Sequence, residues 1–371
     1  MNPYIRKVTV ISGIVFLIGS LALHGQILRD SSTLVIIRQD IDLLYNFKFN
    51  DARNLSDEFI RHYPDHPIVN LISGLTTYWE NYPLLQKSDF QESFENDMRK
   101  CIELSENKRD SANEAEYLLA SLCARGMLLT FYSDNDMIAD VIPLAISTYK
   151  PLRSSFEYTS SCTDLLFFTG LYNYYREAYP KEYPVYKSLA LLFPEGNTET
   201  GIKQLKTSAS GSVVLSPESY YLLSWIYLNF ENNYSESLHF SRTLHEKYPD
   251  NDLYKATFIK NLLLIGKYDE AESLFSESSG SDNGSYLSAQ LSVFKAILQE
   301  KKYKNPALAE ELYNIGIHNL SDFGSYANEY IAYGYYGLSR ISKSRGENHT
   351  AKIYRNQAEK HAEFKKISFD R

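Results

Sequence analysis

Cysteine is scarce in this sequence of 371 residues, which has only three, at Cys101, Cys123 and Cys162. An odd number excludes a fully paired disulfide framework, because at most one internal disulfide can form and one thiol stays free. The stretches around all three cysteines are typical of helices. We therefore expect three buried thiols that pack as small apolar side chains, with a single disulfide as the alternative.

Motifs that carry catalysis are also missing. The sequence has neither glycine-rich phosphate loop, Gly-x-x-x-x-Gly-Lys-Ser/Thr or Gly-x-Gly-x-x-Gly, and it lacks Gly-x-Ser-x-Gly and His-Glu-x-x-His. His62 and His66 have the spacing of helical metal ligands, but Pro64 lies between them, so we expect them to flank an exposed turn. Acidic pairs such as Glu114 and Glu116 are expected on solvated helix faces. We predict no enzymatic activity, no metal and no cofactor.

Basic residues are outnumbered in this chain. Lys and Arg total 38 against 46 Asp and Glu, which gives a formal net charge of −8. Such a surface repels phosphate backbones and anionic lipid headgroups, and no run of Lys and Arg forms a local basic patch. We therefore exclude nucleic acid as the main partner. We expect contact with a membrane only through the N-terminal segment, and only if that segment is not cleaved.

Charge is missing altogether from residues 8–23, near the N-terminus. Arg6 and Lys7 precede this apolar run, and small or polar residues follow it. That order is typical of a secretory signal peptide, so we predict one over residues 1–25 and an exported protein of the periplasm or cell envelope. The alternative is a membrane anchor over residues 8–23. Sixteen helical residues span only about 24 Å of a hydrocarbon core about 30 Å thick, which favours the signal peptide.

What the sequence does contain is internal repetition. Residues 225–250 and 259–282 match at a spacing of 34 residues, and each window has the pattern of two helices separated by a break. The matching pairs are Trp225 and Ile259, Leu228 and Leu262, Tyr234 and Tyr268, and Ser237 and Ala271. Asn232, Gly266 and Gly346 each stand five residues before a small residue of the following helix. A left-handed backbone is needed where the first helix ends, and Gly or Asn adopts it with little strain.

This spacing resembles the tetratricopeptide repeat, a pair of antiparallel helices with small residues near positions 8 and 20 and a proline near position 32. Ser237 fits position 20, where the two helices cross closely, and Pro249 fits position 32, where the second helix stops. The resemblance implies an all-α fold, a right-handed superhelical solenoid of antiparallel hairpins over residues 26–371. The best-matching repeats cover residues 219–285, and the flanking units are degenerate.

One hairpin departs from the repeat. Gly170 fits position 8 of a first helix and Gly201 fits position 20 of the second, but they are 31 residues apart where the family has 12. We assign the excess to an inserted loop over residues 179–196, which carries three prolines. Loops this long inside compact folds are commonly functional or packed as a plug.

Tyrosine is abundant, with 31 in the chain, and it gathers in and around this insert. A tyrosine offers a large face for stacking and a hydroxyl group at low entropic cost. As candidate partner-binding residues we name Tyr172, Tyr175, Tyr179, Tyr183, Tyr186 and Phe193. The alternative is that these rings, like the cluster over residues 330–336, fill the cores of the hairpins, where the repeat demands large side chains.

The sequence therefore predicts a non-catalytic scaffold that binds a protein or peptide partner. Stacked hairpins form a concave face from the first helix of each repeat, which suits an extended peptide or a partner helix. The alternative is a small-ligand or glycan-binding helical protein that uses the Tyr-rich insert, residues 179–196, as a lid. No residue pattern identifies the partner.

Overall fold

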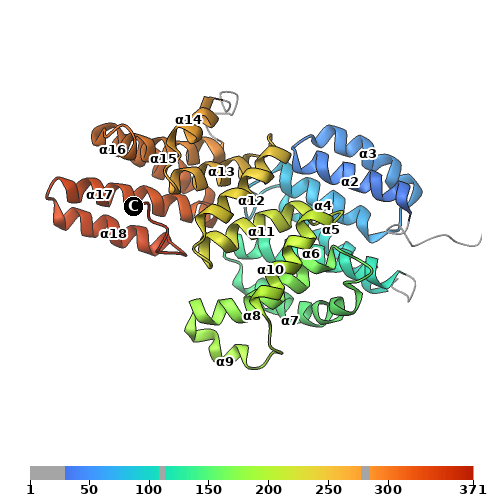
Figure 1. The fold of residues 1–371 in the computed structure, drawn as a ribbon. Helices are drawn as coiled ribbons and strands as arrows, with labels where there is room; N and C mark the ends of the chain where they lie inside the picture. Colours follow the sequence, from blue (N-terminus) through green and yellow to red (C-terminus); the bar gives the residue numbers. More distant parts are fainter. Residues whose placement is uncertain (1–29, 108–112, 277–284, 371) are drawn as a thin grey trace, which may run out of the picture.

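The computed structural model describes residues 30–107, 113–276 and 285–370, and this part of the chain contains helices and no strand (Figure 1). The all-α prediction is therefore confirmed, while the predicted signal peptide, residues 1–25, lies outside the described residues. None of the described helices is long and apolar enough to cross a membrane. The helices are α2 (Ser31–Tyr45), α3 (Phe49–His62), α4 (Pro67–Glu80), α5 (Gln91–Asn107), α6 (Glu114–Asp134), α7 (Ile138–Ser155), η2 (Phe156–Tyr158), α8 (Leu165–Glu182), η3 (Pro184–Tyr186), α9 (Lys187–Ala190), α10 (Thr198–Gly211), α11 (Ser216–Asn229), α12 (Tyr234–Lys247), α13 (Asp252–Leu264), α14 (Tyr268–Ser276), α15 (Tyr286–Lys301), α16 (Pro306–Leu320), η4 (Ser321–Ala327), α17 (Asn328–Ser344) and α18 (Asn348–His361).

Consecutive helices pack as hairpins, and the hairpins stack (Figure 1). The second helix of each hairpin also contacts the first helix of the next one, which confirms the solenoid predicted from the repeat. First helices are covered on both sides, so they can be buried around most of their circumference; in α13 every residue from Tyr254 to Leu263 is buried. The pairs within the described ranges are α2/α3, α4/α5, α6/α7, α8/α10, α11/α12, α13/α14, α15/α16 and α17/α18.

The turns within the hairpins form where the repeat pattern places them. Asn232, Gly266 and Gly346 have φ values of 51°, 76° and 80°. These values lie in the left-handed region, where a side chain with a Cβ atom is strained and where Gly and Asn are tolerated best. The prediction that these residues end the first helices of their hairpins is confirmed.

The close helix crossings are also where the small residues predict them. A Cβ atom on Gly201 of α10 would lie 2.8 Å from the carbonyl oxygen of Gly170 in α8 and 2.7 Å from the backbone nitrogen of Tyr174. In the hairpin of α11 and α12, the hydroxyl groups of Ser224 and Ser237 are 3.1 Å apart. The two backbones of each hairpin therefore approach too closely for larger residues at these positions.

The inner face of the superhelix is filled by the protein's own aromatic rings. Tyr45 of α2 stacks on Tyr254 of α13 with ring centroids 6.3 Å apart. Tyr82, which follows α4, lies 6.2 Å from the ring of Tyr286 and 5.8 Å from that of Tyr326. These contacts join residues about 200 positions apart, so the coil closes on itself. The open concave groove that the repeat resemblance implies is therefore occupied in this region by tyrosines.

Polar contacts hold the first hairpin in this closed position. The hydroxyl of Tyr248 donates to a carboxylate oxygen of Asp42 at 2.7 Å, and the side-chain amide of Asn251 donates to the carbonyl oxygen of Tyr45 at 2.9 Å. Lys48 forms an ion pair with Asp250. The loop between α12 and α13 is thus bound to α2 and to the turn that follows it.

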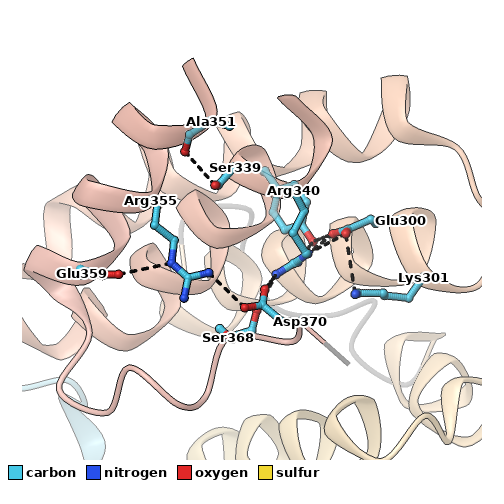
Figure 2. A network of polar contacts seen from close by, with 10 residues as sticks. Glu300, Lys301, Ser339, Arg340, Ala351, Arg355, Glu359, Ser368 and Asp370 are labelled. Carbon is cyan, nitrogen blue, oxygen red and sulfur yellow. Dashed lines mark hydrogen bonds and ion pairs between the residues drawn. The ribbon is translucent and has the colours of Figure 1, made fainter. Parts of the chain in front are cut away.

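The C-terminal segment folds back after α18 and lies against the middle of the chain. Phe364 contacts the rings of Trp225 and Phe230, each with centroids 5.5 Å apart. Figure 2 shows how the end of the segment is anchored, with Asp370 between Arg340 and Arg355 at 3.4 and 3.0 Å. These contacts hold the segment across the inner face between α11 and α17.

Three expectations from the sequence need correction. Residues 179–196 are not one loop, because α8 continues to Glu182 and a short helix, α9, follows. Pro180 lies in the last turn of α8, and its missing N–H group removes only one helical hydrogen bond, the one to the carbonyl of Arg176 four residues earlier. His66 does not flank an exposed turn; it is buried and pairs with Glu116 at 2.5 Å, so Glu116 does not lie on a solvated face either.

The three cysteines are buried free thiols. Burial raises the pKa of Cys101 and Cys162 to about 12 and that of Cys123 well above its usual range. All three thiols therefore stay protonated at physiological pH and act as small apolar side chains. This agrees with the packing interpretation of the sequence.

Candidate functional site

Helix α7 exposes apolar side chains to solvent, which the other second helices largely avoid. Ile138, Ile142 and Ile146 are 58%, 55% and 72% exposed, and the helix buries only Ser155 fully. Residues four apart lie on the same face of a helix, so the three isoleucines form one stripe. Exposed apolar stripes of this kind commonly mark interaction sites.

A large apolar cavity lies behind this stripe. It has a volume of about 870 Å³ and is enclosed by α6, α7 and α8, with Phe193 of the insert at one side. Its size is in the range that holds a bound ligand or the side chains of a docked segment. The lining residues on the three helices are Leu122, Cys123, Gly126, Met127, Leu129 and Thr130 of α6, Val141, Ile142, Ala145, Ile146, Thr148, Tyr149 and Leu152 of α7, and Phe167, Phe168 and Leu171 of α8.

The floor of the cavity holds one acidic group, and that group already has a partner. The carboxylate of Glu218 accepts a hydrogen bond from the hydroxyl of Tyr45 at 2.6 Å. Burial raises the pKa of Glu218 and raises that of Tyr45 well above its usual range. Neither group is free to bind or to react, so the cavity selects an occupant by shape and apolarity.

The end of the insert forms one edge of the cavity. The ring of Phe193 packs edge-on against Tyr149 of α7, with centroids 4.9 Å apart. Its backbone is fixed to α8, because Arg176 donates to the Phe193 carbonyl at 3.0 Å and Tyr172 donates to the Pro194 carbonyl at 2.7 Å. Just outside this edge, Leu191 and Leu192 are 82% and 76% exposed and extend the apolar rim.

The six residues predicted to bind a partner fall into two separate groups. Phe193 lines the cavity, and the hydroxyl of Tyr172 donates to the neighbouring carbonyl of Pro194. The remaining four form a chain of ring contacts along the end of α8 and the segment after it. Tyr175 packs against Phe230 at 5.3 Å, Tyr179 against Tyr183 at 4.7 Å and Tyr186 at 5.2 Å, and Tyr183 against Phe364 at 6.4 Å. The structure therefore does not bring the six residues into one site.

Sequence reasoning missed α7. Its apolar residues recur at helical spacing, which is visible in the sequence, but a pattern of this kind does not show which face a neighbour covers. Metal binding finds no support in the structured ranges, which contain no group of three His, Cys, Asp or Glu side chains able to hold an ion. His66, the best single candidate, caps α4 by accepting from the Ile68 N–H at 3.2 Å and pairs with Glu116.

Comparisons with known proteins give little beyond the fold. No described protein family matches this sequence, and no curated protein matches it. Among solved structures, the chain is similar to the crystal structure of yeast Tom70, with 13% sequence identity and a TM-score of 0.38. The similarity covers 80% of this chain and 61% of the Tom70 chain, so this protein spans less than two thirds of that relative's length. The assignment as an α-solenoid of hairpins rests on the helix pairing itself.

Proposed function

We propose that the protein is a non-catalytic binding scaffold that holds an apolar helical segment of a partner protein against α7. The observation that carries this proposal is the stripe of exposed isoleucines beside an apolar cavity. Burying such a stripe releases water from apolar surface, which is the main source of affinity in protein association.

The shape of the surface favours an elongated occupant. Ile138 and Ile146 are eight residues apart, about 12 Å along the axis of α7. A partner helix with apolar residues at similar spacing covers this length and places one or two large side chains in the cavity behind it. Leu191 and Leu192, directly before Phe193 in the chain, add two further exposed apolar side chains.

The depth of the cavity supports a second candidate, a small apolar ligand. The cavity reaches inward to Tyr45, Leu75 and Glu218, beyond α7 and the insert. A slender apolar molecule would reach this floor more readily than the side chains of a docked helix. In that case the end of the insert, residues 191–196, would act as the lid.

Export stays part of the proposal. The basic start, the apolar run over residues 8–23 and the small residues that follow support a cleaved signal peptide and a mature protein in the periplasm or cell envelope. Cell fractionation followed by N-terminal sequencing of the mature protein tests this. A protein that keeps Met1 and is recovered from the cytosol would contradict it.

A photo-crosslinking amino acid tests the docking surface directly. Placed at Ile146 it should capture a defined apolar segment from envelope extract, identified by mass spectrometry of the joined peptide. The matched control is Ile353 of α18, which is 46% exposed but lies on another helix. Ile142→Asp should abolish the capture and leave the melting temperature unchanged, since this side chain is exposed. Equal capture at both positions, or capture that survives Ile142→Asp, would rule out the α7 site.

The small-ligand candidate has its own test. Native mass spectrometry of the purified protein should then show a bound apolar molecule. Gly126→Leu would fill the cavity from α6, because the nearest atom to a Cβ at this position is 4.0 Å away. If this variant loses the bound molecule but still crosslinks at Ile146, then the cavity holds the small ligand and the isoleucine stripe binds the partner segment independently.

A further inference from the structure

A second cavity, which shares no lining residue with the first, has a different chemistry. Its volume is about 440 Å³, and it is bounded by α6, α11, α15, α17 and the C-terminal segment. Its walls include the rings of Tyr82, Trp225, Tyr286 and Tyr326. Aromatic faces carry partial negative charge, so a cavity with several of them attracts cations.

The protein already places one ammonium group beside this cavity. Lys260 is buried, and its Nζ lies 3.0 Å from both carboxylate oxygens of Glu329. The same Nζ is 5.9 Å from the centroid of the Trp225 ring. Glu329 also accepts from the hydroxyl of Tyr333. The combination of an aromatic face and a carboxylate thus binds an alkylammonium group of this chain, and Glu329 is neutralised by it.

Two further carboxylates of the cavity are not neutralised in this way. Asp134, at the end of α6, and Glu363, in the C-terminal segment, both line the cavity. No hydrogen bond or ion pair joins either side chain to another described residue. Asp134 is partly buried, and desolvation raises its pKa to about 7, with the nearby carboxylates of Glu363 and Asp136 adding to the effect.

The basic groups nearby do not compensate this charge. Lys360 lies at the rim with its side chain exposed to solvent. His361 shares a hydrogen bond with Asn328 at 2.7 Å, and burial lowers its pKa, so the ring is neutral at physiological pH. The cavity therefore combines aromatic walls with two carboxyl groups that lack a basic partner, and an entering cation would favour the ionised form of Asp134.

We propose that this cavity binds a protonated primary amine, with its ammonium group between Asp134 and Glu363 and its methylene chain against Tyr82, Trp225 and Tyr326. A neutral ligand such as a sugar would leave both carboxylates without a positively charged partner. A bare metal ion would gain little from the aromatic walls, because burial raises the pKa of Tyr82 and Tyr286 and their protonated hydroxyl groups are poor metal ligands. The site is separate from the α7 surface and does not depend on it.

Calorimetric titration of the full-length mature protein with 1,5-diaminopentane tests the proposal, with 1-pentanol as the neutral probe. The diamine should bind and the alcohol should not. Asp134→Asn and Glu363→Gln should each weaken binding of the diamine by about tenfold, since each removes one charge-assisted contact with an ammonium group. The matched control Glu311→Gln changes the net charge equally but lies exposed on α16, and it should leave binding unchanged.

A second titration distinguishes the source of the amine. A peptide with one internal lysine is compared with the same peptide carrying norleucine. Tighter binding of the lysine peptide than of the diamine identifies a partner's side chain as the ligand, and the reverse identifies a free amine. Failure of both amines to bind, equal binding of 1-pentanol, or an equal effect of Glu311→Gln would overturn the proposal. Thermal unfolding of each variant confirms that it is folded.

Discussion

Asp40 illustrates how single residues set the pH response of this fold. It is buried in α2, where one carboxylate oxygen accepts from the hydroxyl of Ser56 at 2.8 Å and the other has no hydrogen-bond partner. Desolvation outweighs the single hydrogen bond and raises its pKa to about 6. An acid whose pKa is higher in the folded state releases its proton first in the unfolded chain, so ionisation favours unfolding.

Asp40→Asn should therefore alter stability in one pH window only. As pH rises from about 4 to about 6, ionisation of Asp40 lowers the free energy of unfolding of the native protein by at most about 3 kcal/mol. Asp40→Asn cannot ionise, so its free energy of unfolding should not fall in this window. Urea unfolding at pH 4.5 and pH 7.5 measures the difference. Asp57→Asn, at an exposed position of α3, is the control and should follow the native profile. Parallel pH profiles for Asp40→Asn and the native protein would contradict the argument.

At the scale of elements, the sequence predicts hairpins well and their exposure poorly. Left-handed residues such as Gly266 and small residues such as Gly201 define turns and crossings through constraints within one hairpin, so their spacing was sufficient. The exposure of α7 depends on whether another helix packs against its outer face. The spacing of apolar residues in the sequence contains no information on that. The same limit applies to the inserted segment, which the sequence predicts as a loop from residue 179 although α8 continues through Pro180 to Glu182.

The crossing of α8 and α10 should not tolerate even a methyl group. Gly201→Ala places a Cβ against the backbone of both Gly170 and Tyr174, so we expect a loss of about 1–3 kcal/mol in the free energy of unfolding. Gly126→Ala in α6 is the matched control, because it has open space and should stabilise the helix by about 0.5–1 kcal/mol. Denaturant unfolding of the two variants gives both values. A neutral Gly201→Ala would show that the helices separate easily at this crossing.

At the scale of the molecule, the interior rings decide how the protein unfolds. Hairpins in an open solenoid contact only their neighbours and can unfold one after another. Here Tyr45 contacts Tyr254, and Tyr82 contacts Tyr286, so distant hairpins share one interior. Neither contact was predictable from the sequence, because repeat spacing describes adjacent units and carries no information on contacts 200 residues apart.

The two tryptophans lie in different halves of the chain, so their fluorescence can show whether the halves unfold together. Trp79 lies in α4 and Trp225 in α11. Their fluorescence, read separately in Trp225→Phe and Trp79→Phe variants, should change at the same denaturant concentration, since the closed interior couples both halves. Tyr82→Ala removes the ring that contacts Tyr286 of α15 and Tyr326 of η4. It should lower the denaturant midpoint and separate the two transitions. Different midpoints for the two single-tryptophan variants, with Tyr82 intact, would contradict a coupled interior.

Closure of the coil has a consequence for how such a chain can change over generations. Open arrays gain or lose whole units by duplication and deletion, because each new unit needs only a neighbour to stack on. In this molecule an added hairpin between α4 and α15 would rotate Tyr286 and Tyr326 away from Tyr82 and break their ring contacts. Insertion or deletion of a whole hairpin between α4 and α15 should therefore destabilise this fold, whereas substitutions and changes of loop length away from these contacts should be tolerated.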